Sequence, residues 1–148
     1  MARRFRIRQV TPGDFPAILA IDRKIVGRER ARSYQQHVAR YLDNYFPPLS
    51  HVAVIGEQVV GFILGDIRGW EYGLAPSGWI DIMGVDPEHH RQGVGLALVR
   101  AFASQCRRRK LSAIHAMVRG TDRRLQGFLR DAGLQKGPLV DFYSPLRE

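Results

Sequence analysis

Hydrophobic positions along the chain follow two periods, which predict strands and helices in turn. Residues 5–10 alternate apolar and polar side chains, as a half-buried strand does. Thr11-Pro12-Gly13-Asp14 then ends this strand and offers an N-cap for a helix over residues 15–27. A second amphipathic helix is predicted over residues 33–45, because two prolines follow at 47 and 48. The chain therefore opens with a strand and two helices.

The rest of the chain continues with strands and helices of ordinary length. Gly56-Glu57-Gln58 separates two β-branched runs and predicts a hairpin, whereas the glycine-rich residues 69–78 predict a loop. The predicted strands are 51–55, 59–67, 79–85, 114–118 and 140–143. One further helix is predicted to begin at Val94, and another to span residues 122–132. The order β-α-α-β-β-β-α-β-α-β predicts a mixed α/β fold in a single domain over residues 1–148.

Composition narrows the class of protein. The 148 residues carry 45% hydrophobic residues, too many for a disordered chain, and a single cysteine, Cys106, excludes a disulfide-stapled scaffold. Neither a signal-peptide core nor a membrane span is apparent in the sequence. We therefore expect a soluble, cytoplasmic protein with no membrane partner. Cys106 lies at core spacing, which favours inert packing, and the scattered histidines lack zinc-ligand spacing, so no metal is expected.

The chain is strongly basic, with a formal net charge of +9 carried almost entirely by arginine. The densest run is Arg107-Arg108-Arg109-Lys110. One interpretation is a nucleic-acid patch. The other is a solvated helix end, where cations meet the negative pole of the helix dipole. The absence of interleaved aromatic residues favours the second interpretation.

Residues 85–95, Val-Asp-Pro-Glu-His-His-Arg-Gln-Gly-Val-Gly, join a predicted strand to a predicted helix. Gly93 and Gly95 allow close approach of a ligand to the backbone, and the first helical turn presents N–H groups that the helix itself leaves unsatisfied. Such a turn at the positive end of the dipole is suited to a pyrophosphate. A P-loop would need Gly-Lys-Ser/Thr, and a dinucleotide fingerprint would need a third glycine where Leu98 stands.

The element order and this segment resemble the GNAT superfamily of N-acetyltransferases. The family signature is Arg/Gln-x-x-Gly-x-Gly/Ala after Val-x-Pro-Glu/Asp, and the chain has Val85-x-Pro87-Glu88 followed by His90-x-x-Gly93-x-Gly95. The resemblance extends from the first strand to Gly133-Leu134, where the family typically has Gly-Phe. It implies that acetyl-CoA, as co-substrate, binds at this strand-loop-helix.

By the same resemblance, the strand over residues 79–85 is splayed from its neighbour, so that pantetheine can insert between them. Gly84 is compatible with a bulge in that strand. His90 stands where the family has Arg or Gln. This difference affects one side-chain contact to the coenzyme, whereas the backbone N–H groups of the first helical turn, the cradle for the pyrophosphate, are unaffected. The residues expected to contact the coenzyme are Met83, Gly84, Val85, His90, Arg91, Gln92, Gly93, Val94, Gly95 and Leu96.

Acyl transfer to an amine requires removal of a proton from the amine and delivery of one to the leaving thiolate. Asp81 is the candidate base, since it lies in an otherwise apolar strand where many GNAT sequences carry Asp or Glu. The alternative is a surface carboxylate paired with an arginine. Many relatives protonate the thiolate with a tyrosine four residues before the Gly of Gly-Phe, where this chain has Leu129. N-terminal acetyltransferases of the ribosomal type often carry a glutamate on the following strand, where this chain has Met117, and both differences point away from a standard enzyme of that type.

The thiolate acid must therefore come from elsewhere, and Tyr143 on the predicted last strand is our candidate. Tyr72 is a second candidate, and either tyrosine is alternatively a packing or surface residue. Tyr34, Glu71 and Tyr72 are predicted to line the acceptor site, and Tyr34 is alternatively a core residue on its helix.

These observations predict an acetyl-CoA-dependent N-acetyltransferase that acts on a primary amine by direct attack in a ternary complex. A peptide or protein amine is favoured slightly over a small molecule. The alternative is a nucleic-acid- or ribosome-binding module that keeps the fold without turnover. A homodimer is a further assembly to consider, because GNAT proteins are often dimers.

Overall fold

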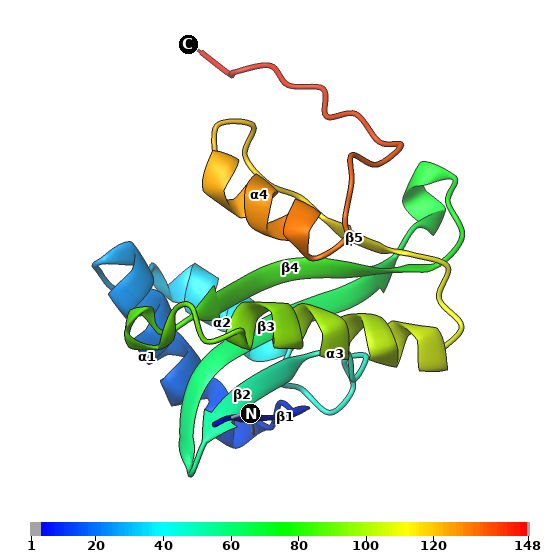
Figure 1. Cartoon of the computed structure of the whole chain (residues 1–148). Helices are drawn as coiled ribbons and strands as arrows, with labels where there is room; N and C mark the ends of the chain where they lie inside the picture. Colours follow the sequence, from blue (N-terminus) through cyan, green and yellow to red (C-terminus); the bar gives the residue numbers. More distant parts are fainter. Residues whose placement is uncertain (1–3, 148) are drawn as a thin grey trace.

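A twisted sheet of five strands, in the order β1-β2-β3-β4-β5, lies between two layers of helices (Figure 1). The computed structural model describes residues 4–147, so residues 1–3 and 148 of the expected domain lie outside it. Strands β1 to β4 are antiparallel neighbours, and β5 is parallel to β4. The strands are β1 (Arg6–Gln9), β2 (His51–Ile55), β3 (Gln58–Arg68), β4 (Ser77–Val85) and β5 (Ile114–Ala116), and the α-helices are α1 (Phe15–Val26), α2 (Arg32–Arg40), α3 (Val94–Arg108) and α4 (Arg123–Asp131).

The two faces of the sheet bury separate apolar clusters. Phe62 and Leu64 of β3 pack with α1 and α2, whereas Ile63 between them packs with α3, as the period of two requires. Glycine allows α3 to lie close to the sheet, because a Cβ at Gly65 would come within 2.3 Å of the Phe102 ring. The sheet is thus covered on both faces.

A bulge interrupts β4 opposite the middle of β3. Gly65 pairs with Ile80 and Leu64 pairs with Ile82, so Asp81 is the extra residue. Ile80 packs on the α3 side, whereas Ile82 packs on the side of α1 and α2. The prediction of a bulge at Gly84 is therefore wrong in position. Gly84 instead accommodates Ile25, whose Cδ1 would be 2.8 Å from a Cβ at that position.

Strands β4 and β5 separate after a short parallel ladder. Gly78, Trp79 and Ile80 pair with Ile114, His115 and Ala116, where β5 ends, and β4 continues for five residues beyond. This arrangement agrees with the predicted splay. It leaves the β5-facing edge of β4 over residues 81–85 without a ladder partner among the described residues.

The predicted second helix and the predicted last strand differ most from the structure, and the strand predicted over residues 114–118 ends already at Ala116. The second helix ends at Arg40 rather than residue 45, because Asp43 accepts a hydrogen bond from the Tyr45 N–H at 2.9 Å and forms a turn. The predicted strand over residues 140–143 is wrong: residues 135–147 contain neither helix nor strand. A strand requires a neighbour for its backbone hydrogen bonds, and this segment runs away from the sheet (Figure 1). Within residues 4–147, no helix is long and apolar enough to cross a membrane.

Candidate functional site

The N-terminus of α3 presents a row of backbone amides next to the end of β4. The 3-10 turn η3 (Pro87–His89) precedes it, and the left-handed backbone of Arg91 (φ 63°) and Gly93 (φ 81°) turns the chain into the helix. The first intrahelical hydrogen bond runs from the Ala97 N–H to the Gly93 carbonyl, at 3.0 Å. The N–H groups of Val94, Gly95 and Leu96 lie before that bond, at the positive end of the dipole.

The side chains around these amides are arranged so that a ligand would meet mainly backbone. Arg91, Gln92 and Gly93 are exposed, whereas the Val94 side chain is buried in the core below. A Cβ at Gly95 would lie 3.1 Å from the Phe128 ring, so glycine lets α3 approach α4 there. The predicted cradle residues are therefore contiguous in space as well as in sequence, and this backbone geometry suits an anionic phosphate group.

His90 is held against the strand rather than projecting into the cradle. Its Nε2 lies 3.1 Å from the Val85 carbonyl oxygen. Met83 and Gly84 pair with Ile63 and Phe62 of β3 on one side, and their other edge faces the opening between β4 and β5. The departure from the family's Arg/Gln thus gives this chain a contact that closes the loop onto the end of β4.

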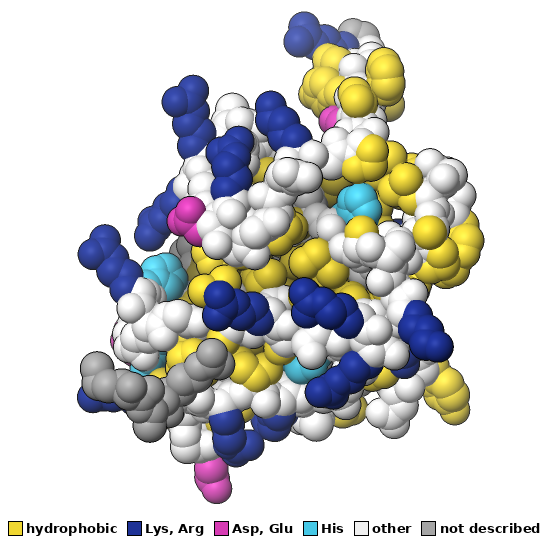
Figure 2. Space-filling view, turned by 45° about the vertical axis from the view of Figure 1, so that its right-hand side comes forward, with side chains coloured by type: hydrophobic (Ala, Val, Ile, Leu, Met, Phe, Trp, Pro, Cys, Tyr) yellow, Lys and Arg dark blue, Asp and Glu magenta, His cyan; other side chains and the backbone are white. Residues whose placement is uncertain are grey.

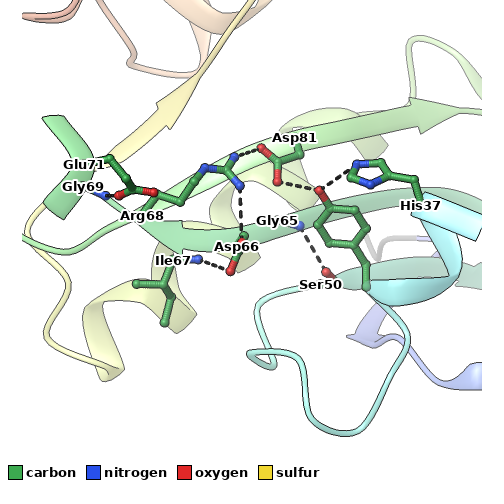
Figure 3. A network of polar contacts seen from close by, with 10 residues as sticks. His37, Ser50, Gly65, Asp66, Ile67, Arg68, Gly69, Glu71 and Asp81 are labelled. Atoms are coloured by element: carbon green, nitrogen blue, oxygen red, sulfur yellow. Dashed lines mark hydrogen bonds and ion pairs between the residues drawn. The ribbon is translucent and has the colours of Figure 1, made fainter. Parts of the chain in front are cut away.

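Asp81 is the centre of a polar network between the sheet and α2 (Figure 3). Arg68 of β3 forms an ion pair with its Oδ1, and the Tyr41 hydroxyl donates to its Oδ2 at 2.7 Å. Asp66 accepts from the same guanidinium at 3.3 Å. The arginine pairing that we expected as the alternative to a base is therefore present, although each carboxylate oxygen keeps a further lone pair for a ligand.

Tyr41, like Arg68 and Asp66, is a residue of this network that the sequence did not single out. It follows α2 directly, is 5% exposed, and its hydroxyl also lies 3.4 Å from the exposed His37 Nε2. Burial, together with the hydrogen bond to Asp81, raises the pKa of Tyr41 well above its usual value, so the hydroxyl remains a donor. The sequence signal for it was helical spacing: Tyr34, Tyr41 and Tyr45 fall on one side of the predicted second helix.

We expect Tyr41→Phe to lower the free energy of unfolding by about 1–3 kcal/mol, the typical cost of leaving a partly buried acceptor unpaired. The ring contact with Phe46, at 4.9 Å between centroids, would be retained. Urea denaturation measures the change. Tyr45→Phe is the matched control. Tyr45 is 98% exposed, so the loss of its hydroxyl should leave the free energy of unfolding unchanged. Equal stability of both variants would show that the bond to Asp81 contributes nothing.

Aromatic rings line the same face of the sheet beside Asp81. Trp79 stacks on His115 of β5, with centroids 4.6 Å apart, and Tyr72 lies 5.6 Å from Trp79. The Arg68 guanidinium is 5.3 Å from the Trp79 ring. The buried Trp79 Nε1 has no hydrogen-bond partner among the described residues. Two carboxylates, one guanidinium and these rings form a surface of net negative charge, which suits a cationic amine.

The remaining predicted site residues are Glu71, Tyr34 and Tyr143, and each has its own surroundings. Glu71, in the 3-10 turn η2 (Trp70–Tyr72), accepts the Gly69 N–H at 3.0 Å, and backbone hydrogen bonds lower the pKa of its carboxyl. Tyr34 turns toward α1, where its hydroxyl is 3.5 Å from Asp22 and Arg30 covers its ring. Tyr143 is 81% exposed on the segment that leaves the sheet, so the structure does not bring it to Asp81.

The basic run lies at the end of α3. Arg107 and Arg108 form its last turn, and Lys110 follows in a left-handed conformation (φ 59°). This is the position where cations interact favourably with a helix dipole. Figure 2 shows Lys and Arg side chains distributed over one face of the molecule, with uncharged surface between them. The placement supports the helix-end interpretation.

Comparison with known proteins agrees with this geometry. The model of the Acetyltransferase (GNAT) family matches residues 15–134. Among curated proteins, N-alpha-acetyltransferase 30 of Xenopus laevis is 28% identical over 97 residues, which is 66% of this chain and 31% of that protein. The human protein of the same name is 27% identical over 66% of this chain and 24% of its own length. The match therefore spans less than a third of these relatives.

Solved structures share the fold. The aminoglycoside N-acetyltransferase AAC(6')-Iy in complex with CoA has a TM-score of 0.81 at 16% identity, covering 98% of this chain and 97% of that one. Ard1 from Thermoplasma volcanium has a TM-score of 0.72 at 25% identity, covering 88% and 82%. The amide cradle at α3, the opening between β4 and β5, and the family match over residues 15–134 lead to one conclusion: the chain belongs to the GNAT acetyltransferase family.

Proposed function

We propose that this chain transfers an acetyl group from acetyl-CoA to the α-amine of a peptide or protein. The family membership and the cradle support the use of acetyl-CoA, and the CoA-bound relative has the same fold. The N-alpha-acetyltransferase relatives favour an α-amine over a small molecule. The observation that carries the proposal is the site at Asp81, which is anionic and aromatic, and lies on the strand that also borders the cradle.

The residues at α3 fit a pyrophosphate group. The amides of Val94, Gly95 and Leu96 would donate to it, and Gly93 leaves open space above the turn, since nothing lies within 4 Å of a Cβ built there. Arg91 and Gln92 add exposed donors at the same loop. The edge of β4 over Met83 to Val85 would hold the extended part of the coenzyme. Acetyl-CoA supplies the activated acyl group when bound.

Asp81 would bind the acceptor amine and accept its proton, directly or through a water molecule. Arg68 and Tyr41 hold the carboxylate in one orientation, and the Arg68 guanidinium that pairs with it also lies against the Trp79 ring. An α-amine needs little help from a base, because its pKa near about 8 leaves a sizeable neutral fraction at physiological pH, whereas a lysine amine with a pKa near about 10.4 is almost fully protonated there.

The thiolate leaving group needs a proton donor, and Tyr72 is our first candidate. It borders the aromatic cluster through Trp79 and is half-exposed, so its hydroxyl is accessible to a ligand. Tyr143 keeps its predicted role only if the C-terminal segment is repositioned in an assembly.

The test is a screen of acetyl-CoA consumption over three kinds of acceptor. We expect peptides with a free α-amine to react at least about tenfold faster than the same peptides blocked at the N-terminus and carrying a free lysine, because the required deprotonation is easier by roughly two pKa units. An aminoglycoside serves as the small-molecule comparison. Turnover of the aminoglycoside alone would contradict the peptide assignment and keep the acetyltransferase reaction. A failure of all three, together with no binding of acetyl-CoA by calorimetry, would overturn the reaction itself.

A further inference from the structure

Asp86 is a buried carboxylate at the point where β4 leads into the N-terminus of α3. It is 2% exposed and directly follows the last residue of β4. Its Oδ1 accepts a hydrogen bond from the Glu88 N–H at 3.0 Å, and its own N–H donates to the Val60 carbonyl of β3 at 2.8 Å. Asp86 therefore fixes the start of residues 86–93, which we call the cradle loop.

A buried negative charge at this place opposes the binding of an anion. The amides that end the cradle loop suit a pyrophosphate, and like charges at a binding site cost affinity. A buried carboxylate is also unfavourable in itself unless a cation pairs with it. The cradle therefore suits an anionic coenzyme only if the charge of Asp86 is compensated.

Lys24, in the last turn of α1, supplies a positive charge at the required place. Its Nζ donates to Oδ2 of Asp86 at 3.0 Å and lies 3.9 Å from Oε2 of Glu88. Because Asp86 is buried, this contact differs from an ion pair between two solvated side chains. Burial alone would raise the pKa of Asp86, but the hydrogen bonds from the Glu88 N–H and Lys24 lower it below its ordinary value. The pair is thus a carboxylate and an ammonium ion.

The contact comes from the helix layer opposite α3. α1 packs with Phe62 on one face of the sheet, whereas α3 packs on the other. Ile25, the residue after Lys24, meets β4 as well, since its Cδ1 would be 2.8 Å from a Cβ at Gly84. The last turn of α1 therefore contacts the end of β4 and the start of the cradle loop, and it is not part of the α3 N-terminus.

We propose that Lys24 is a positioning residue for the coenzyme: it neutralises Asp86 and holds the start of the cradle loop, so that an anion can bind at the amides of α3. The inference rests on the part of the proposed function that places acetyl-CoA at these amides. It gives α1 a role in coenzyme binding, although none of the expected coenzyme contacts lies in that helix.

The test measures acetyl-CoA binding by isothermal titration calorimetry, with circular dichroism of each coenzyme-free variant as the check of folding. Lys24→Met should weaken binding at least about tenfold, because it leaves the Asp86 carboxylate without its ammonium partner. Lys24→Arg keeps the positive charge and should bind within about threefold of the wild type.

Arg23→Met is the matched control for the loss of one positive charge from α1. Arg23 is adjacent to Lys24, and its ion pair with Glu29, at 3.3 Å, joins two exposed side chains. A pair of this kind contributes little. We expect this variant to bind acetyl-CoA as the wild type does.

A double variant separates charge compensation from packing. Asp86→Asn keeps an oxygen that can accept from the Glu88 N–H and removes the negative charge. Lys24→Met combined with Asp86→Asn should recover binding to within about threefold of the wild type, since no buried charge is then left unpaired. If Lys24→Met alone does not fold, this double variant decides the question.

Equal binding by Lys24→Met and the wild type would overturn the inference and leave the proposed function standing. A double variant that binds as weakly as Lys24→Met would also overturn it, because the lysine would then act by packing alone. An equal loss in Arg23→Met would assign the effect to net charge and refute the positioning role. If the wild type binds no acetyl-CoA, the proposed coenzyme is itself wrong, and the role of Lys24 is refuted with it.

Discussion

Gly93→Glu is expected to weaken acetyl-CoA binding at least about 100-fold, measured by isothermal titration calorimetry. Two effects act together. A carboxylate at this position would lie beside the amides that we assign to the pyrophosphate, and like charges at a binding site cost several kcal/mol. In addition, Gly93 has a φ of 81°, a left-handed conformation that costs a residue with a side chain about 1–2 kcal/mol.

Gly56→Glu separates the two effects. Gly56 has a φ of 59° with open space around it, so glutamate there carries a comparable backbone strain and the same charge. It lies in the turn between β2 and β3, outside the segment of residues 85–96 that forms the cradle. We expect this variant to lose a similar amount of stability and to bind acetyl-CoA normally. Normal binding by Gly93→Glu would mean that the coenzyme does not use this cradle.

Asp81→Asn is expected to lower kcat/KM for the acceptor by about 100-fold or more, the usual contribution of a positioned base. The amide of asparagine neither accepts the amine proton nor attracts an ammonium ion, and its NH2 group would compete with the Arg68 donors. Binding of acetyl-CoA should be unchanged, because Asp81 contacts Tyr41 and is not part of the α3 N-terminus. The defect should shrink as the pH rises past about 8, since an α-amine is then neutral without help.

Asp66→Asn is the control for the loss of a charge beside Arg68. Asp66 accepts from the same guanidinium, at 3.3 Å, but not from Tyr41. We expect its rate to stay within about tenfold of the wild type, which is below the range of a lost general base. If Asp81→Asn retains full activity while its stability falls, Asp81 serves only as the ion-pair partner of Arg68, and the base must be another group.

The cradle was predictable because its signal is local. Gly93 and Gly95 stand within one helical turn, and the physics of a helix N-terminus acts over the same few residues. Asp81 was detectable for a related reason: a lone acid in an apolar strand contradicts the pattern around it. The family match over residues 15–134 confirms the fold that these local signals indicated.

The missed features depend on contacts between distant parts of the chain. Tyr41 reaches Asp81 across 40 residues of sequence, and no spacing rule connects a residue beyond α2 to the middle of β4. The position of the bulge at Asp81 rather than Gly84 depends on the register with β3, which an isolated strand does not specify. The strand predicted over residues 140–143 failed because a strand-forming composition gives no neighbour to pair with.

The bulge in β4 also explains why the sheet opens where it does. An extra residue shifts by one position which amides of a strand point to one neighbour and which point to the other. Up to Ile80, β4 is in phase with β5; from Ile82 onward it keeps its ladder with β3 and falls out of step with any continuation of β5. One residue, Asp81, would thus serve twice: its side chain would supply the charge for the proposed acceptor, and its extra position in the strand takes β4 out of step with β5 beside the place where the coenzyme would lie.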